Sequence, residues 1–245
     1  MREFRNKVAV VTGAASGIGK ALVEKCLNEG MQVVLADVEE AALAVTVDEF
    51  QSKGHNNLLP VTTDVSKLSE IEALLDTTIN TFGAVHLLFN NAGVTGSGSV
   101  LDASINDWNW VMGVNLWSVI YGLRTFVPKM IEQDCDCHVV NTASVFGLIP
   151  GVQAAGYGVT KHGVVVLTES LFSELQQKNA KVKVSVLCPG FIRTNLIDAE
   201  RNRASELQNE TVKELTAEEE QGREMFRQLL ANGMDPAELA EITFQ

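Results

Sequence analysis

Short apolar runs alternate with longer amphipathic stretches along this chain, and this alternation limits the fold more than any other feature. Apolar runs this short, ended by glycine or polar residues, predict strands that are buried on both faces. The predicted strands cover residues 7–12, 32–37, 57–63, 85–90, 138–144 and 181–188. The predicted helices cover residues 17–29, 39–53, 69–81, 105–131 and 156–178, with Pro128 as a potential bend or break in the fourth. Strands that alternate with helices favour an α/β fold, a doubly wound parallel β-sheet flanked by helices.

Length, composition and charge narrow the class of protein. The chain has 245 residues, of which 46% are hydrophobic, and no linker or repeat divides it. This is enough to bury one core, so we expect a single domain over residues 1–245. The formal charge of −12 argues against a nucleic-acid partner, which needs clustered lysine and arginine. No apolar stretch approaches the roughly 18–20 residues of a membrane span, so we expect no membrane partner.

The N-terminus and the cysteines bear on the compartment. The opening residues, MREFRNK, lead directly into a predicted strand and carry no signal-peptide pattern. Without export there is no reason to pair the four cysteines, so we expect a reduced, cytoplasmic location. Cys135, Cys137 and His138 suggest a metal site by their spacing, but no second cluster of ligands accompanies them. We expect a plain turn between helix and strand there, and no metal.

Residues 191–234 interrupt the alternation of strands and helices. They are polar and helix-prone and show no strand pattern. An insertion of this length in a compact fold favours a lid over a substrate, and the alternative is an ordinary pair of solvated helices. Asp235 and Pro236 match the N-cap and first residue of a final helix. A further strand would normally follow in such a sheet, so either the sheet is one strand short or the natural chain continues past Gln245.

A glycine-rich loop joins the first predicted strand to the first predicted helix. It reads TGAASGIG over residues 12–19, with glycines at Gly13, Gly17 and Gly19. Glycines at such a turn let the backbone approach a pyrophosphate, which the helix N-terminus attracts. The spacing differs from the commoner Gly-x-Gly-x-x-Gly, but the position between strand and helix is the one that dinucleotide binding requires. The loop predicts a Rossmann-type domain that binds a dinucleotide.

Asp37 ends the second predicted strand and bears on the choice of cofactor. A carboxylate at this place accepts hydrogen bonds from the adenosine ribose hydroxyls. It would repel a 2′-phosphate by roughly 4 kcal/mol at about 4 Å and an effective dielectric constant near 20. No arginine or lysine stands in the glycine loop or directly after Asp37 to bind that phosphate. We therefore expect NAD rather than NADP, with a helix-capping role for Asp37 as the alternative.

Tyr157 and Lys161 are spaced to share one helix face, and Ser144 ends the strand before that helix. With these residues the sequence resembles the classical short-chain dehydrogenase/reductase family. The resemblance extends over residues 7–195, in the family's order and spacing. Its motifs are TGxxxGIG at 12–19, NNAG at 90–93, Asn115, Ser144, YxxxK at 157–161, and Pro189, Gly190 and Thr194.

The resemblance implies a catalytic set of Asn115, Ser144, Tyr157 and Lys161. Tyr157 would exchange a proton with the substrate, and Ser144 would hydrogen-bond the substrate oxygen. A tyrosine pKa near 10 is too high for a base at neutral pH, but an ammonium about 5 Å away would lower it by about two units. Lys161 would supply that charge and hold the nicotinamide ribose, and Asn115 would hold a water linking Lys161 to solvent.

The resemblance also implies which residues contact the cofactor, the substrate and a second subunit. The cofactor residues are Gly13, Ser16, Gly17, Ile18, Gly19, Asp37, Asp64, Val65, Asn91, Ala92, Gly93, Tyr157, Lys161, Gly190, Ile192 and Thr194. Ser144 and Tyr157 would contact the substrate. By sequence placement, we expect an apolar pocket formed by Thr95, Val145, Phe146, Val152, Phe191, Leu196 and Ile197. A homodimer or homotetramer is implied, with helices 105–131 and 156–178 at the interfaces.

Together these residues predict an oxidoreductase, an NAD-dependent short-chain alcohol dehydrogenase or ketone reductase. It would transfer a hydride between NAD(H) and a small secondary alcohol or ketone, apolar near the reacting carbon. One alternative is a catalytically silent sensor or scaffold that binds the nicotinamide dinucleotide, which the intact catalytic set counts against. An epimerase or dehydratase of the wider family is another alternative, but it usually carries a longer substrate domain.

Overall fold

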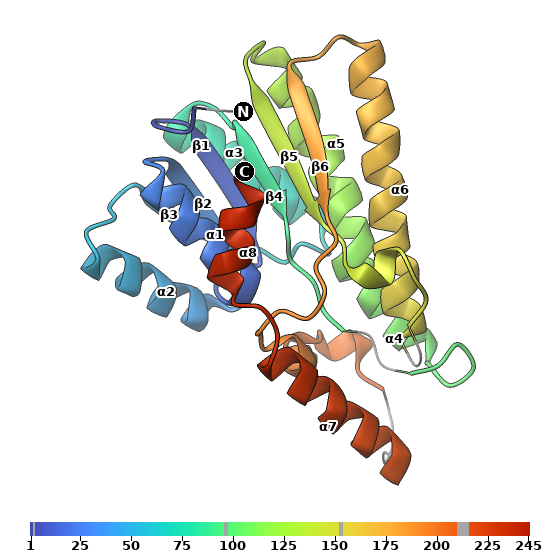
Figure 1. The fold of residues 1–245 in the computed structure, drawn as a ribbon. Coiled ribbons are helices and arrows are strands. Elements are labelled where there is room, and N and C mark those ends of the chain that lie inside the picture. The colour runs from blue at the N-terminus through green and yellow to red at the C-terminus, as the bar shows by residue number, and fades with distance from the viewer. Residues whose placement is uncertain (2, 96–97, 152–153, 210–215) are drawn as a thin grey trace.

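The structure, a computed structural model, describes residues 1, 3–95, 98–151, 154–209 and 216–245. Its centre is one six-stranded sheet in the order β3-β2-β1-β4-β5-β6, in which every pair of neighbouring strands is parallel (Figure 1). The strands are β1 (Val8–Thr12), β2 (Gln32–Asp37), β3 (Leu58–Thr62), β4 (Leu87–Asn90), β5 (Cys137–Thr142) and β6 (Val182–Leu187). The predicted doubly wound parallel sheet is confirmed, because the order runs outward in both directions from β1 and β4.

Helices cover both faces of the sheet. They are α1 (Gly17–Asn28), α2 (Glu40–Ser52), α3 (Leu68–Phe82), α4 (Ile105–Met112), α5 (Ser118–Glu132), α6 (Ala155–Gln177), α7 (Ala217–Ala231) and α8 (Pro236–Thr243). One face packs against α1, α2 and α8, and the other against α3, α5 and α6 (Figure 1). Successive residues of a strand point to opposite faces, so Val11 belongs to the first core and Val10 to the second.

The region predicted as one long helix over 105–131 is divided in the structure. α4 runs into a π-helical turn, Gly113–Trp117, and α5 follows it. Pro128 lies inside α5, which continues to Glu132, so the proposed break at this proline is wrong. The irregularity falls instead at Asn115, and single π-turns of this kind are frequent at functional sites.

Residues 191–209 and 216–234 lie beyond the carboxyl ends of the strands (Figure 1). The two ends of this segment are joined by a bridge between Ile192 and Met234, in which Met234 N donates to Phe191 O at 3.0 Å and Arg193 N to Met234 O at 3.0 Å. Between them lie two 3₁₀ helices, Leu196–Asn202 and Ser205–Leu207, and then α7. The helical character predicted for this segment is confirmed over its described residues.

The C-terminal helix packs back onto the body of the domain. Asp235 accepts a hydrogen bond from Ala237 N at 2.8 Å and Pro236 is the first helical residue, as predicted. α8 then lies against α1, and Phe244 contacts Phe4 in a tilted arrangement with ring centroids 4.9 Å apart. The two ends of the chain are therefore close together (Figure 1).

Within the described ranges, no helix is both long and apolar enough to cross a membrane. Cys135 lies in the turn between α5 and β5, with its sulfur 3.8 Å from that of Cys137, so the predicted turn is confirmed. His138 is hydrogen-bonded to Ser185 at 2.8 Å on β6. Over the same ranges, no three side chains of histidine, cysteine, aspartate or glutamate are grouped to hold a metal.

Candidate active site

A cavity of about 330 Å³ lies at the carboxyl ends of the strands. Every residue expected to contact the cofactor lines it, from Gly13 in the first loop to Thr194 after β6. Ser144, Tyr157 and Lys161 line the same cavity. Ligands bind at this edge in doubly wound sheets, because the loops that leave neighbouring strands diverge there.

Two glycines allow the glycine-rich loop and the start of α1 to form one wall of the cavity. A Cβ on Gly19 would lie 1.9 Å from Gly13 O, so only glycine fits where α1 begins against the loop. Gly17 has φ +52° and lies against Thr194, whose Cγ2 would be 2.9 Å from an added Cβ. The first turn of α1 carries no acidic residue, so nothing in that turn neutralises the positive end of the helix dipole. This end of the cavity suits a pyrophosphate.

Thr12 holds the loop that follows β4 in place. Its hydroxyl donates to Phe89 O at 3.2 Å and accepts from Asn91 N at 2.9 Å and Ala92 N at 3.1 Å. Asn91 Nδ2 returns a bond to Thr12 O at 3.0 Å. The sequence gives Thr12 a place in the glycine motif but no role, because its partners come from β4 and the loop after it.

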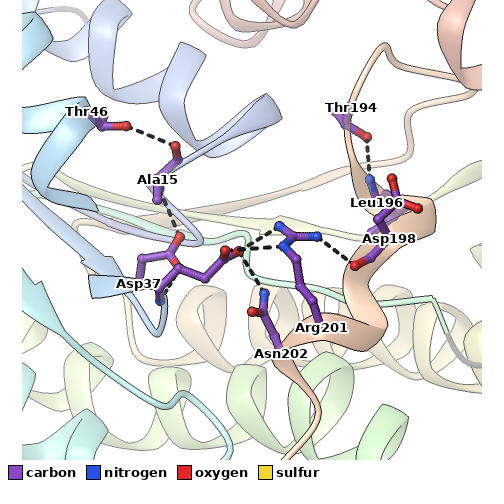
Figure 2. Close-up of polar contacts among 9 residues, drawn as sticks. Ala15, Asp37, Thr46, Thr194, Leu196, Asp198, Arg201 and Asn202 are labelled. Atoms are coloured by element: carbon purple, nitrogen blue, oxygen red, sulfur yellow. Dashed lines mark hydrogen bonds and ion pairs between the residues drawn. The ribbon is translucent and has the colours of Figure 1, made fainter. Parts of the chain in front are cut away.

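Asp37 is held by the backbone on two sides. Its Oδ2 accepts from Ala15 N at 2.9 Å and its Oδ1 from Glu39 N at 3.0 Å (Figure 2). Burial raises the pKa of Asp37, while these hydrogen bonds act in the opposite direction. The N-cap of α2 is Glu39, so the alternative of Asp37 as helix cap is wrong. The side chain of Asp37 faces the cavity beside the glycine loop.

Asp64 and Val65 line the cavity next to the end of β3. Asp64 Oδ1 accepts from Ser66 Oγ at 2.6 Å and from Ser66 N at 3.0 Å, and its Oδ2 lies 3.2 Å from Lys67 Nζ. Burial is the largest single effect and raises the pKa of Asp64, but the bonds from Ser66 and Lys67 together lower it below its ordinary value.

Ser144, Tyr157 and Lys161 meet at the other end of the cavity. Ser144 caps the short helix Val145–Gly147, and its hydroxyl accepts from Phe146 N at 3.2 Å. Tyr157 and Lys161 lie one turn apart near the start of α6. Lys161 Nζ is 5.6 Å from the centroid of the Tyr157 ring and donates to Thr142 O at 2.8 Å. Only 3% of Lys161 is exposed, and this burial lowers its pKa to about 8.

The pKa of Tyr157 differs from the sequence-based expectation. Burial raises it, and a hydrogen bond with Ser144 acts in the opposite direction. The expectation of a lower Tyr157 pKa rested on the charge of Lys161 alone. It left out the loss of water around the phenol, which disfavours the charged form. Burial also brings the pKa of Lys161 down to about 8, so its positive charge is itself lost at mildly alkaline pH.

Asn115 lies behind the cavity and does not line it. It is fully buried; its Oδ1 accepts from Val94 N at 2.8 Å and its Nδ2 donates to Val94 O at 2.9 Å and Thr160 Oγ1 at 3.3 Å. Gly93 separates it from Lys161, since a Cβ there would lie 3.4 Å from both Asn115 Oδ1 and Lys161 Nζ. Asn115 therefore connects the loop after β4 to α6.

The expected substrate pocket is largely wrong. Of its described members only Leu196 lines the cavity, and Val152 lies outside the described residues. Phe146 packs instead edge-on against Tyr157 with ring centroids 6.3 Å apart, and Phe191 packs against Phe226 at 6.1 Å. The apolar wall is formed by α4, the turn after it and the 191–234 segment, through Trp110, Val114, Leu196, Ala199, Ala204, Leu207 and Leu230.

Sequence reasoning also missed a cation near Asp37. Arg201 and Asn202, from the 191–234 segment, line the cavity beside Glu39. Arg201 Nη2 and Nε donate to the two Glu39 oxygens at 2.6 and 3.2 Å, and Asn202 Nδ2 donates to Glu39 Oε1 at 2.8 Å (Figure 2). The arginine is 162 positions from its partner, so no local pattern could have placed it there.

Known proteins resemble this chain in both sequence and fold. The family model for short chain dehydrogenases matches residues 7–205. A cyclohexanol dehydrogenase from an Acinetobacter species is 36% identical over 80% of this chain and 76% of its own length. A short chain dehydrogenase/reductase from Burkholderia phymatum, solved in complex with NAD, is 44% identical with a TM-score of 0.95. That match covers 100% of this chain and 86% of the solved one.

A polyketide ketoreductase for actinorhodin, solved with NADPH, is 30% identical with a TM-score of 0.80. It aligns over 99% of this chain and 90% of the solved one. Both family dinucleotides, NAD and NADPH, thus occur among proteins of this fold. The family model, the fold and the cavity agree, and this chain therefore belongs to the short chain dehydrogenase family of oxidoreductases that use a nicotinamide dinucleotide.

Proposed function

We propose that this protein is an NAD-dependent dehydrogenase of small secondary alcohols, or the corresponding ketone reductase. The observation that carries the proposal is that one cavity is lined at one end by the glycine loop and Asp37 and at the other by Ser144, Tyr157 and Lys161. A dinucleotide laid along this cavity would bring its nicotinamide next to Tyr157.

The charged and polar groups that line the cavity are complementary to those of NAD. The N-terminus of α1 suits the pyrophosphate, and Asp37 suits the adenosine ribose. Each carboxylate oxygen of Asp37 accepts one backbone hydrogen bond and retains capacity for a ribose hydroxyl. Thr194 and Ile192 lie across from the glycine loop, where the carboxamide would be held. The NAD complex of the Burkholderia phymatum protein supports this choice.

The chemistry at Tyr157 is a proton transfer. Nicotinamide bound beside Tyr157 would supply the chemistry of hydride transfer. Tyr157 Oη takes the proton of the alcohol during oxidation and returns it during reduction. Ser144 Oγ donates a hydrogen bond to the substrate oxygen as charge develops on it. Lys161, while protonated, favours the phenolate form of Tyr157, and Asn115 positions the loop that packs against Lys161.

The apolar part of the cavity lining is consistent with an apolar substrate. Trp110 and Val114 approach from the side of α4, and Leu196 and Leu207 from the 191–234 segment. The cyclohexanol dehydrogenase among the relatives is consistent with such a substrate. The bridge between Ile192 and Met234 joins the two ends of the segment, which is consistent with a role as a lid.

We also propose a homodimer or homotetramer in the cytoplasm. Helix α6 exposes Val159, Val166 and Phe172, an apolar set that a second subunit would cover. All four cysteines are free thiols, which suits a reducing compartment.

The experiment that tests the function is a panel of secondary alcohols, cyclic and linear, assayed with NAD⁺ and with NADP⁺ at mildly alkaline pH. We expect turnover of at least one apolar alcohol and a preference for NAD⁺ of about a hundredfold, as a charge repulsion of a few kcal/mol implies. Equal rates with NADP⁺ would refute the cofactor assignment. Tight NADH binding without turnover of any alcohol or ketone would favour the silent sensor instead.

A further inference from the structure

The 191–234 segment reaches Glu39, two residues after the end of β2, at the edge of the cavity. Arg201, in the 3₁₀ helix Leu196–Asn202, is paired with Glu39, and both side chains line the cavity with Asp37 (Figure 2). Asp37 and Glu39 are joined by the bond from Glu39 N to Asp37 Oδ1. Two carboxylates and one guanidinium therefore stand together at the adenosine end of the site.

A 2′-phosphate would enter this group of charges, because the ribose that carries it is held by the carboxylate at the end of the second strand. A guanidinium is the side chain best suited to bind such a phosphate. Arg201 uses its Nε and one Nη2 hydrogen on Glu39 and one Nη1 hydrogen on Asp198 O at 2.8 Å. Two of its five N–H groups remain for an added anion.

Glu39 determines whether Arg201 can act on that anion. The carboxylate takes a two-pronged ion pair from the guanidinium and a third bond from Asn202, so it cancels the charge and holds the side chain in place. The same contacts lower the pKa of Glu39 below its ordinary value, so it stays ionised at neutral pH. With Glu39 ionised, the three side chains carry one net negative charge.

We propose that Glu39 is a second specificity residue, which excludes NADP by occupying Arg201. The proposal rests on the proposed use of NAD and adds to Asp37 a partner from the lid. When Glu39 loses its charge, the freed guanidinium of Arg201 balances the charge of Asp37. The local net charge then becomes zero, and Arg201 is available to bind the phosphate. Loss of Arg201 alone leaves two carboxylates and repels the phosphate more strongly.

The test is binding of ADP-ribose and 2′-phospho-ADP-ribose, which lack nicotinamide and report on this end of the site without any turnover. The dissociation constants are measured by calorimetry for the wild type, Glu39→Gln, Arg201→Met and the double variant. We expect Glu39→Gln to improve the affinity for the phosphorylated ligand relative to ADP-ribose by about tenfold, a gain that falls with added salt. Arg201→Met should shift the ratio the other way, and the double variant should return close to the wild-type ratio.

Glu49→Gln is the matched control. It removes the same charge from an exposed glutamate that is paired with Lys20 and Lys53 and does not line the cavity. Its ratio should equal that of the wild type. If circular dichroism shows that Glu39→Gln is misfolded, Glu39→Ala repeats the main test with a different side chain.

The outcomes separate this proposal from the proposed function. An unchanged ratio of the two dissociation constants in both Glu39 variants would overturn the proposal. A gain in affinity for the phosphorylated ligand that persists in the double variant would also overturn it, because removal of the Glu39 charge alone would then explain the gain. In either case the wild type would still bind ADP-ribose and the function would stand. A wild type that binds neither ligand would instead overturn the assigned cofactor end and this inference with it.

Discussion

Lys161 Nζ lies 5.6 Å from the centroid of the Tyr157 ring and is held there by a hydrogen bond of 2.8 Å to Thr142 O. Lys161 is buried and Tyr157 is partly buried, so each is more sensitive to the charge on the other than it would be in water. Burial favours the neutral form of both side chains: it raises the pKa of Tyr157 and lowers that of Lys161.

The stability of the protein should carry the signature of Lys161. Its pKa in the folded state is about 8, below the ordinary 10.5, so protonated Lys161 opposes folding by about 3 kcal/mol. Between those two pH values the unfolded chain binds the extra proton, so stability rises with pH over that interval. Below pH 8 both states are protonated and the cost is fully present.

Lys161→Met removes this contribution. The difference in unfolding free energy between wild type and variant, measured by urea titration from pH 7 to 10.5, should shift in favour of the wild type as pH increases. The comparison cancels the other groups that titrate in this range. A difference independent of pH would show that Lys161 keeps an ordinary pKa.

Tyr157→Phe should abolish turnover and leave dinucleotide binding close to that of the wild type. A positioned general acid–base group contributes about 10² to 10⁴ in rate, and phenylalanine keeps the ring packed against Phe146. The measurements are kcat with a responsive alcohol and NADH affinity by fluorescence. Tyr121, the other tyrosine of the chain, stacks on Trp117 away from the cavity, so Tyr121→Phe is the matched control and should remain active.

Arg203 should be important for the stability of the 3₁₀ helices Leu196–Asn202 and Ser205–Leu207 and their packing on α4. Its side chain is 4% exposed, lies 2.8 Å from a carboxylate oxygen of Asp107 on α4, and stacks over Trp110 at 5.2 Å. Arg203→Met leaves Asp107 buried and unpaired, a loss of about 3 kcal/mol. We expect a lower Tm, or faster proteolysis within 191–234 if only the lid opens.

Two further variants separate the ion pair from simple packing. Adding Asp107→Asn to Arg203→Met should recover part of the loss, because the unpaired charge is then gone. Arg227→Met removes an exposed arginine of α7 that pairs with Asp198 at 3.4 Å, and it should cost less than about 1 kcal/mol. Equal losses for the buried and the exposed arginine would contradict the buried pair.

Gly19→Ala should eliminate dinucleotide binding. The Cβ of the alanine would lie 1.9 Å from Gly13 O. Because the clash is with the backbone, Gly13 cannot move away without opening the loop. Gly222, within α7, has nothing within 4 Å of an added Cβ, so Gly222→Ala should bind normally and stabilise its helix by up to about 1 kcal/mol. Normal ADP-ribose affinity in the Gly19 variant would contradict the structure of this loop.

The glycine loop, Asp37 and the Tyr157–Lys161 spacing were all predictable from the sequence, because each depends on neighbours a few positions away. Strand and helix periodicity placed the loops at one edge of the sheet, and the order of the motifs then brought the cofactor residues into one cavity. For such local features the backbone itself sets the geometry.

Only the tertiary structure decided the features that depend on distant side chains. Asn115 proved to be buried behind the site, Trp110 to line it, and Arg201 to reach Glu39 from the far end of the chain. The direction of the Tyr157 pKa also depended on the fold, because burial is a property of everything packed around the phenol. Sequence spacing specifies which groups share a helix face, whereas desolvation and contacts across the lid follow from how the finished chain packs.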